Sequence, residues 1–535
     1  MRIIFSIVLL SLLGGWGRID LTADKRYTLS EPTCRMLHDL DAPVTVDILL
    51  DGDLNPGFVR LKKAAEETVE EMNKASKVRI AIGKGEGLET LKKQLQPSVI
   101  HERENNGRTV QTTVYPYAVI HYKGRTHTLS LLTNRRDQSG EENINSSIEN
   151  MEFAFAEALQ LLCQDSVECI AFLEGHGELT EHDTYDLTQA LSHYFQVDRG
   201  TLNNTYGILD GYKVVIIADP QDAFSEADKY ILDQYVMQGG RILWLVSGVE
   251  FSDNMLSDEG FTPVLPHRIN LTDLFFRYGI RINADLVQDL QCLPVPVEVS
   301  GRRQPDGSAQ FQPLPWTYAP LLLTSEASPI THNVMQVFGT FVSSVDLVGD
   351  DEQLHQQVLL ATSTASRRTG TPAEVDLSDL NADPEQFNSA FLPVAALTEG
   401  QFTSHFAHLM PPEEIKGAPT TRKESPVTKQ IMVACGNIAR NEWHQGQPLP
   451  AGFDRYTRTM FGNRDFLVNA VLYLADDNGL IQLRNKNIQL RLLNDRRAHQ
   501  LKTRIQIAGI ALPIAVLGLV GLLCYLFRKK QARQS

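Results

Sequence analysis

A repeated alternation between apolar strands and helices constrains the fold of this 535-residue chain most strongly. Apolar runs rich in β-branched residues occupy 167–173, 214–218 and 242–246, and helical patterns occupy 181–195 and 226–238 between them. Continuous apolar strands that are separated by helices are typical of a parallel sheet covered on both faces. The alternation therefore predicts a Rossmann-like α/β body.

Strand and helix patterns further along the chain extend the body, and other patterns upstream indicate a separate, smaller domain. Strands at 357–362 and 430–434 and a strongly periodic helix at 464–475 lead us to place the body at 148–475. Residues 18–140 predict a small α/β domain, in which Ser30 caps a helix that has Pro32 in its first turn. The length of the chain also favours more than one domain.

The two ends of the chain are its most apolar segments. Residues 505–527 (IQIAGIALPIAVLGLVGLLCYLF) carry no charge and are long enough, at about 1.5 Å per residue, to cross the hydrocarbon core of a bilayer. A basic juxtamembrane helix is expected before them at 480–504. Residues 1–17 contain a shorter apolar run, typical of either a signal peptide or an uncleaved anchor, and we expect the anchor.

These ends predict where the body lies. Basic residues flank the C-terminal apolar segment on both sides, so charge alone does not decide its orientation. A short apolar N-terminus that follows Arg2 would start export, and the C-terminal segment would stop it. We therefore expect an inner-membrane protein with most of its chain periplasmic and its C-terminal tail cytoplasmic.

Composition excludes some classes of protein. The formal net charge is −15, whereas a nucleic-acid-binding protein needs a basic face. The six cysteines show no metal-ligand spacing and are too few for a disulfide scaffold. We predict no nucleic-acid partner, no metal and no cofactor.

A polar turn at the end of the first body strand is the candidate site. It consists of Glu174, Gly175, His176, Gly177 and Glu178. Ligands of α/β proteins bind at the carboxyl ends of parallel strands, and His176 with Glu174 or Glu178 could bind a metal or act as acid and base. The alternative, which we favour, is a tight turn whose glycines allow positive φ and whose polar side chains are solvated.

Signatures of catalysis are missing from the sequence. Cys435 follows a strand, but Val433 and Asn437 stand where a nucleophile elbow needs glycine. The sequence contains no G-x-x-x-x-G-K-[ST] phosphate loop, so the chain is not itself an ATPase. Asp346, Asp350 and Asp351 suggest either a calcium site or, as we favour, solvated loop charge. We predict no catalytic residue.

Four segments carry a resemblance to a known family. They are DLTADKRYTLS at 20–30, FLEGHGEL at 172–179, DLVQDLQC at 285–292 and FGNRDFLVN at 461–469. In their order and spacing they resemble the gliding-motility ABC transporter component GldG and its relatives. The resemblance implies an inner-membrane protein of Bacteroidetes-type bacteria that works beside an ABC ATPase subunit and a polytopic permease subunit. It also implies a central auxiliary domain related to glutamine-amidotransferase-like and intraflagellar-transport domains.

Three functions remain open from the sequence. The first, which we favour, is a non-catalytic membrane-anchored accessory subunit of an ABC transporter linked to gliding motility or secretion. The second is a periplasmic solute- or glycan-binding component of the same transporter, with the turn at 174–178 lining its pocket. The third is a tethered hydrolase, which would need a nucleophile that the sequence does not reveal.

Overall fold

The structure is a computed structural model, and it describes most of the chain between residues 29 and 477. The positions outside the description in this range are 53, 84–91, 93–94, 96, 104–108, 133–138, 164–166, 304–308, 350–353, 378–382 and 416–419. Positions 479 and 521 are also described. The elements below belong to the first of two compact units, Met1–Lys486 and Asn487–Ser535.

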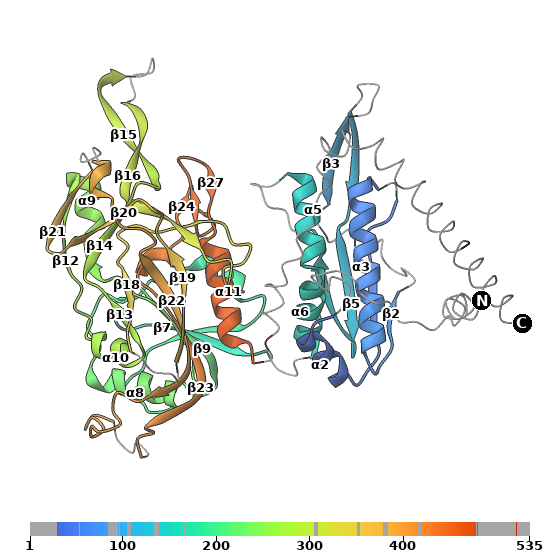
Figure 1. The fold of residues 1–535 in the computed structure, drawn as a ribbon, viewed down its shortest axis with the longest axis horizontal. Helices are drawn as coiled ribbons and strands as arrows, with labels where there is room; N and C mark the ends of the chain where they lie inside the picture. The colour runs from blue at the N-terminus through green and yellow to red at the C-terminus, as the bar shows by residue number, and fades with distance from the viewer. Residues whose placement is uncertain are drawn as a thin grey trace, which may run out of the picture. The chain divides into compact units, whose positions relative to one another are not determined.

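The N-terminal part is a four-stranded sheet with helices packed against it (Figure 1). Strand β1 pairs in parallel with β2 and antiparallel with β5, and β6 completes the sheet. The elements are α2 (Glu31–Asp39), β1 (Val44–Ile48), α3 (Pro56–Ala75), β2 (Ile80–Ile82), β5 (Tyr117–Tyr122) and β6 (Arg125–Ser130), with β3 (Ser98–Arg103) and β4 (Thr109–Val114) in a separate hairpin.

The predicted helix cap in this part is confirmed, and a tight hairpin is a second local feature. The side chain of Ser30 accepts a hydrogen bond from the N–H of Thr33 and caps α2. The hairpin of β5 and β6 turns at Lys123 and Gly124, whose φ angles are 48° and 76°. Positive φ at both central residues is the geometry that matches the twist of a two-residue hairpin.

Two further helices, α5 (Gly140–Glu149) and α6 (Met151–Cys163), complete the N-terminal core. Ile144, Phe155 and Leu159 are buried in one cluster with side chains of α2, α3 and β1. The helical pattern near residue 148, which the sequence analysis assigned to the body, therefore packs with the N-terminal sheet. The body's own sheet begins with β7 (Cys169–Leu173).

The body is built on a ten-stranded sheet. Its strands run in the order β15, β16, β19, β22, β23, β10, β9, β7, β8, and β17 pairs beside β16. They are β8 (Gln196–Gly200), β9 (Tyr212–Ala218), β10 (Ile242–Leu245), β15 (Cys292–Arg303), β16 (Ala309–Thr324), β17 (Val337–Phe338), β19 (Leu354–Ala361), β22 (Pro393–Thr403) and β23 (Glu424–Val433).

The prediction of a parallel Rossmann-like or glutamine-amidotransferase-like body is wrong for half of this sheet. Strands β23, β10, β9, β7 and β8 pair in parallel, but β15, β16, β19, β22 and β23 pair antiparallel. Parallel neighbours need a long crossover connection, usually a helix. The described residues between β19 and β22, and between β22 and β23, contain no α-helix, so the chain turns back on itself there.

The predicted terminal transmembrane helices are also not supported. Within the part of the chain that the structure describes, no helix has the length and apolar character needed to cross a membrane. The segments to which these predictions referred, 1–17, 480–504 and 505–527, lie outside the described residues except for position 521. Over its described residues the structure supports a mixed α/β fold that is rich in antiparallel pairing.

Helices cover both faces of the body sheet, and Figure 1 shows α11 on one side and α8 with α10 on the other. On one face, α7 and α11 bury Leu187, Phe466 and Leu474 against the strands. On the other, α8 and α10 bury Tyr230 and Phe275. These helices are α7 (Tyr185–Leu191), α8 (Glu226–Met237), α10 (Thr272–Arg277) and α11 (Asn463–Ala475).

Short elements complete the body. They are β11 (Val249–Glu250), α9 (Asp253–Glu259), β12 (Phe261–Pro266), β13 (Ile280–Ile282), β14 (Asp285–Asp289), β18 (Val345–Leu347), β20 (Ser366–Gly370), β21 (Ala373–Asp376), η1 (Pro384–Gln386), η2 (Gly436–Ala439), β24 (Trp443–His444), β25 (Gln447–Pro448), β26 (Phe453–Asp454) and β27 (Thr459–Met460). Strand β15 is an edge strand of the large sheet, as the run at 294–299 predicts, but it is longer. Its Pro294 lies opposite Pro315 of β16, and its Pro296 lies opposite Pro313.

Candidate functional site

The parallel half of the sheet contains a reversal in strand order. From β7 the chain first crosses to β8 on one side and then to β9 on the other. The connections that follow β7 and β9 therefore leave the sheet in opposite directions, and α/β proteins bind ligands in the crevice that such a reversal forms. We place the candidate site at this edge of the sheet, where β7, β9, β10 and β23 end.

The turn after β7 contains all five residues that the sequence singled out. Gly175 and Gly177 have φ angles of 117° and 74°, which side chains rarely adopt. A Cβ on Gly177 would also lie 2.9 Å from the Cβ of Gln221, so the turn packs closely on the loop after β9. The carbonyl of His176 accepts a hydrogen bond from the N–H of Gln221 at 2.7 Å, which fastens the two loops together.

His176 points into the protein and only 7% of it is exposed. Its ring stacks on Phe224, with centroids 3.8 Å apart. Its Nδ1 lies 3.2 Å from Oε1 of Glu178, and its Nε2 lies 3.3 Å from Oδ2 of Asp228. Asp228 belongs to the first turn of α8, whose N-cap is Ser225. His176 therefore joins the turn after β7 to the start of α8.

Two carboxylates make His176 a cation at neutral pH. Burial by itself lowers the pKa of His176, but the hydrogen bonds and charges of Asp228 and Glu178 outweigh burial and raise the pKa to about 9. Burial opposes ionisation of Asp228 as well, yet the hydrogen bonds from His176 and Ser225 lower its pKa. A general base must be unprotonated near the working pH. His176 is suited to hold the turn in place and not to accept a proton.

The two glutamates of the turn have different surroundings. Glu178 is buried against His176, whereas Glu174 lies 3.2 Å from the guanidinium of Arg199. That guanidinium is also 4.5 Å from the ring centroid of Phe172. Of the two pairings that the sequence left open, the structure brings together His176 and Glu178. That the turn contacts a ligand stays a prediction.

Asp219, at the end of β9, is a candidate residue that the sequence analysis missed. Its φ is 54°, and only 8% of the residue is exposed. Few residues other than glycine adopt this left-handed conformation, and asparagine and aspartate are the most frequent of them. The sequence signal for it is an aspartate followed by Pro220 directly after a buried strand, a pattern that also simply ends a strand.

The carboxylate of Asp219 connects three strand ends. Its Oδ1 accepts a hydrogen bond from the hydroxyl of Ser247 at 3.2 Å, and Ser247 accepts one from the N–H of Gly436 at 3.0 Å. A Cβ on Gly436 would lie 1.8 Å from Oδ1 of Asp219, so only glycine fits there. Burial raises the pKa of Asp219, although Arg440 and Ser247 act in the opposite direction. None of the hydrogen bonds among the described residues reaches its second oxygen, Oδ2.

These loops enclose a cleft of about 260 Å³. Asp219 and Ser247 line it together with residues from the loops after β7, β10 and β23. Its charged lining residues are Glu178, Asp183, Asp219, Glu250, Asp253 and Arg440. Carboxylates thus outnumber basic groups in the wall of this cleft, which we name the strand-end cleft.

Cys435 lies beside this cleft but is buried. It is fully enclosed, its Sγ lies 3.2 Å from Oδ1 of Asn437, and a Cβ on Gly339 would lie 2.7 Å from that sulfur. Burial raises the pKa of the Cys435 thiol strongly. A thiol that is kept protonated and enclosed is a poor nucleophile.

The structure brings together no metal ligands among the residues it describes. Within them, no three His, Cys, Asp or Glu side chains are arranged to hold a metal ion. Asp346, considered above for calcium, pairs with the guanidinium groups of Arg281 and Arg368. Asp350 and Asp351 lie outside the described residues.

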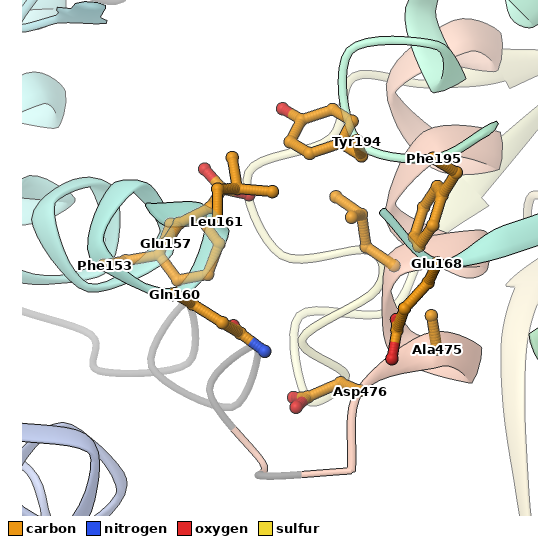
Figure 2. Close-up of a pocket in the computed structure, with 10 residues that line it drawn as sticks. Phe153, Glu157, Gln160, Leu161, Glu168, Tyr194, Phe195, Ala475 and Asp476 are labelled. Atoms are coloured by element: carbon orange, nitrogen blue, oxygen red, sulfur yellow. The ribbon is translucent and has the colours of Figure 1, made fainter. Parts of the chain in front are cut away.

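The opposite end of β7 carries a group of side chains with a different character. Glu168 and Phe195 lie there beside Ala475, at the last turn of α11, and Tyr194 lies next to Phe195 (Figure 2). Figure 2 also draws Phe153 and other residues of α6, which belong to the N-terminal core.

Comparisons with known proteins agree with a transport-related α/β class of protein. Residues 168–470 match the auxiliary family described as an ABC-type uncharacterized transport system. Because this match covers more than half of the 535 residues, the chain belongs to that family. Residues 23–121 match a domain family of unknown function (DUF7088).

The remaining comparisons add little. The N-terminal domain of mmIFT52 is similar at 14% identity and a TM-score of 0.34, over 58% of this chain and 98% of that domain. No curated protein is significantly similar to the chain. The family match supports an auxiliary component of an ABC transport system.

Proposed function

We propose that this protein is a non-catalytic accessory subunit of an ABC transporter, acting beside a separate ATPase subunit and a polytopic permease subunit. The family match over residues 168–470 is the observation that carries the proposal. The sequence contains no phosphate loop of its own, so ATP hydrolysis falls to another chain.

The surroundings of the candidate site support a role without catalysis. His176, the residue best suited by type to act as a base, has a pKa near 9 and both ring nitrogens bound by carboxylates. Cys435, the residue best suited by type to act as a nucleophile, is enclosed. Among the described residues, the Sγ of Cys435 contacts the carbonyl of Thr340 and Oδ1 of Asn437, and neither of these is the general base that an activated nucleophile requires.

A cellular location and a cellular process follow from this role. We propose that the body faces the periplasm at the inner membrane and that the complex serves gliding motility or a related secretion. Protease added to spheroplasts is then expected to digest the body, while a membrane-impermeant probe in the cytoplasm leaves it unlabelled. Deletion of the gene is expected to impair surface spreading or export, and normal performance of both would remove this part of the proposal.

Affinity capture of the full chain from its own cells tests the accessory role. In mild detergent, an ATP-binding subunit and a polytopic membrane protein are expected in a constant ratio to the captured chain. Val215→Asp is the matched control, because it places a carboxylate in the fully buried centre of the body sheet and should unfold the body. Capture of the wild-type chain without either partner would contradict the accessory role.

The strand-end cleft favours a second candidate, a solute- or glycan-binding component of the same system. Its position at a strand-order reversal is typical of ligand sites, and its wall carries a buried carboxylate, Asp219. A rise in melting temperature with a polar solute, lost in Asp219→Asn, would support it. His176→Ala is the weaker probe, because His176 holds the turn and its loss would also change stability.

A further inference from the structure

One oxygen of a buried aspartate in the strand-end cleft has no hydrogen-bond donor among the described residues. Asp219 is more than nine-tenths buried and lines the cleft, and its Oδ1 is held by the hydroxyl of Ser247. Its Oδ2 accepts no hydrogen bond from the described residues. The polar groups of buried residues normally have hydrogen-bond partners, so a carboxylate oxygen that lines a cleft without a donor is available to a donor from a ligand.

The other carboxylates of the cleft differ in the hydrogen-bond donors and cations that the protein provides for them. Glu178 binds His176, and the carboxylate of Asp253 lies 3.0 Å from Arg440, the basic residue of the cleft wall. Asp183 accepts hydrogen bonds from the N–H and hydroxyl of Thr180 and pairs with no cation among the described residues. Glu250 and Asp219 form no ion pair among the described residues, so the charge that remains uncompensated in the cleft is negative.

The cleft wall also has an apolar part. Leu179, Val249 and Phe251 line it, the first two from buried positions. An apolar wall that leads to a carboxylate fits a cation on an aliphatic stem, as lysine-like side chains bury their methylene groups and keep the charged end near a partner. The volume of about 260 Å³ lies below the range that drug-sized ligands fill. A short stem therefore fits better than a whole oligosaccharide.

We propose that the strand-end cleft binds a primary ammonium group on a short alkyl stem, with Oδ2 of Asp219 as its acceptor. The stem lies along Leu179, Val249 and Phe251. A metal ion is a poorer occupant, because no described group of three acidic, histidine or cysteine side chains is arranged to hold one. The ammonium group can belong to a free amine or to a lysine of a peptide, since both present the same chemistry.

Binding to the purified full chain tests this proposal by calorimetry. The probes are 5-aminopentan-1-ol with 1,5-pentanediol as its uncharged match, and acetyl-Gly-Lys-Gly amide with the norleucine peptide as its match. The ammonium probes are expected to bind and the uncharged probes are not. Tighter binding of the free amine would identify a solute site, and tighter binding of the peptide would identify a site for a lysine of another protein.

Asp219→Asn removes the charge and leaves the shape. Asparagine tolerates the left-handed φ of 54° and its oxygen can still accept from Ser247, so the fold is expected to persist. Loss of a charged hydrogen bond is expected to weaken amine binding by about tenfold or more. Glu424→Gln is the matched control, because Glu424 is exposed on β23 away from the cleft lining.

A second variant keeps the test decisive if Asp219→Asn does not fold. Glu250→Gln changes an exposed carboxylate of the cleft and is expected to weaken amine binding about threefold without unfolding the body. Equal binding of charged and uncharged probes, or wild-type amine affinity in both variants, would overturn the proposal. The measurement uses the chain alone, so its failure would leave the accessory role and its co-purification test unaffected.

Discussion

Replacing Asp228 by asparagine removes one of the two carboxylates that hold His176 as a cation. The change keeps the size of the side chain and an oxygen that can accept from the hydroxyl of Ser225. It therefore isolates the charge of Asp228 from its shape. We expect the pKa of His176 to fall from about 9 toward its ordinary value, because Glu178 alone must then oppose the effect of burial.

The size of the effect follows from linkage. A pKa raised from 6.5 to about 9 corresponds to about 3 kcal/mol in favour of the charged form at 1.36 kcal/mol per pKa unit. We reduce this to about 2 kcal/mol, because water at the turn screens part of the interaction. The two carboxylates lie at similar distances, 3.2 and 3.3 Å, and together they also offset burial, so Asp228 contributes at least half of this, roughly 1 kcal/mol or more.

The sign of the pH dependence is fixed by the direction of the shift. The folded protein holds the His176 proton more tightly than the unfolded chain, so this stabilisation is complete below pH 6.5 and is lost as the pH rises through about 9. Urea unfolding followed by circular dichroism across this window is expected to show a loss of about 2 kcal/mol in the wild type and at most about 1 kcal/mol in Asp228→Asn.

The difference between the wild type and the variant cancels the contributions of other groups that titrate in the same pH window. Asp258→Asn, at an exposed position on α9, is the control and should follow the wild type at every pH. The two curves of wild type and Asp228→Asn are expected to converge above pH 9. If they run parallel across the whole range, His176 is not held as a cation and the account of the turn given above is incorrect.

Three further predictions concern positions close to the same edge of the sheet or within its core. Gly436→Ala is expected to cost about 3 kcal/mol of unfolding free energy, because its Cβ would meet Asp219, whereas Gly370→Ala, with open space at its Cβ, should change little in the same urea titration. Asp233→Ala should cost about 3 kcal/mol by calorimetry, because it strands two buried hydroxyl donors and a backbone N–H. Cys435 should resist iodoacetamide in the native protein and react only after unfolding, as peptide mass spectrometry would show.

Local signals in the sequence were sufficient to predict the strands and helices of the parallel half of the sheet. The β-branched runs at 214–218 and 242–246 became β9 and β10, and the pattern at 226–238 became α8 with Ser225 as its N-cap. Gly239 ends that helix region with a φ of 97°. Strand runs, caps and glycine stops act over a few residues, so one sequence contains enough information to find them.

The antiparallel half depends on partners that are distant in the sequence. The polar stretch at 368–389 shows little periodicity, yet it contributes to β20 and contains β21, which pair with β14 and β12. The run at 357–362 was found as a strand, but its antiparallel partner β22 was not. Short strands draw their stability from cross-strand neighbours, and no local pattern encodes the direction of pairing.

The position of the candidate site could be predicted from the sequence, but only some of its residues could. A glycine-rich polar turn after a buried strand led to the residues around His176, because ligand sites gather at strand ends. The orientation of His176 toward Asp228 could not be inferred, since α8 lies far along the chain. Asp219 was missed because its importance arises from packing against Gly436 and Ser247, which only the folded sheet brings together.

The proline pairs of β15 and β16 affect how this protein meets other chains. Two prolines that face each other across an antiparallel pair cannot exchange N–H bonds, so their ring nitrogens point away from the partner strand. Along β15 this direction is the free margin of the sheet, and the donors that an incoming strand would need are missing at Pro294 and Pro296. The long hairpin is thereby protected against strand-by-strand stacking into fibrils, a hazard for any unpaired margin.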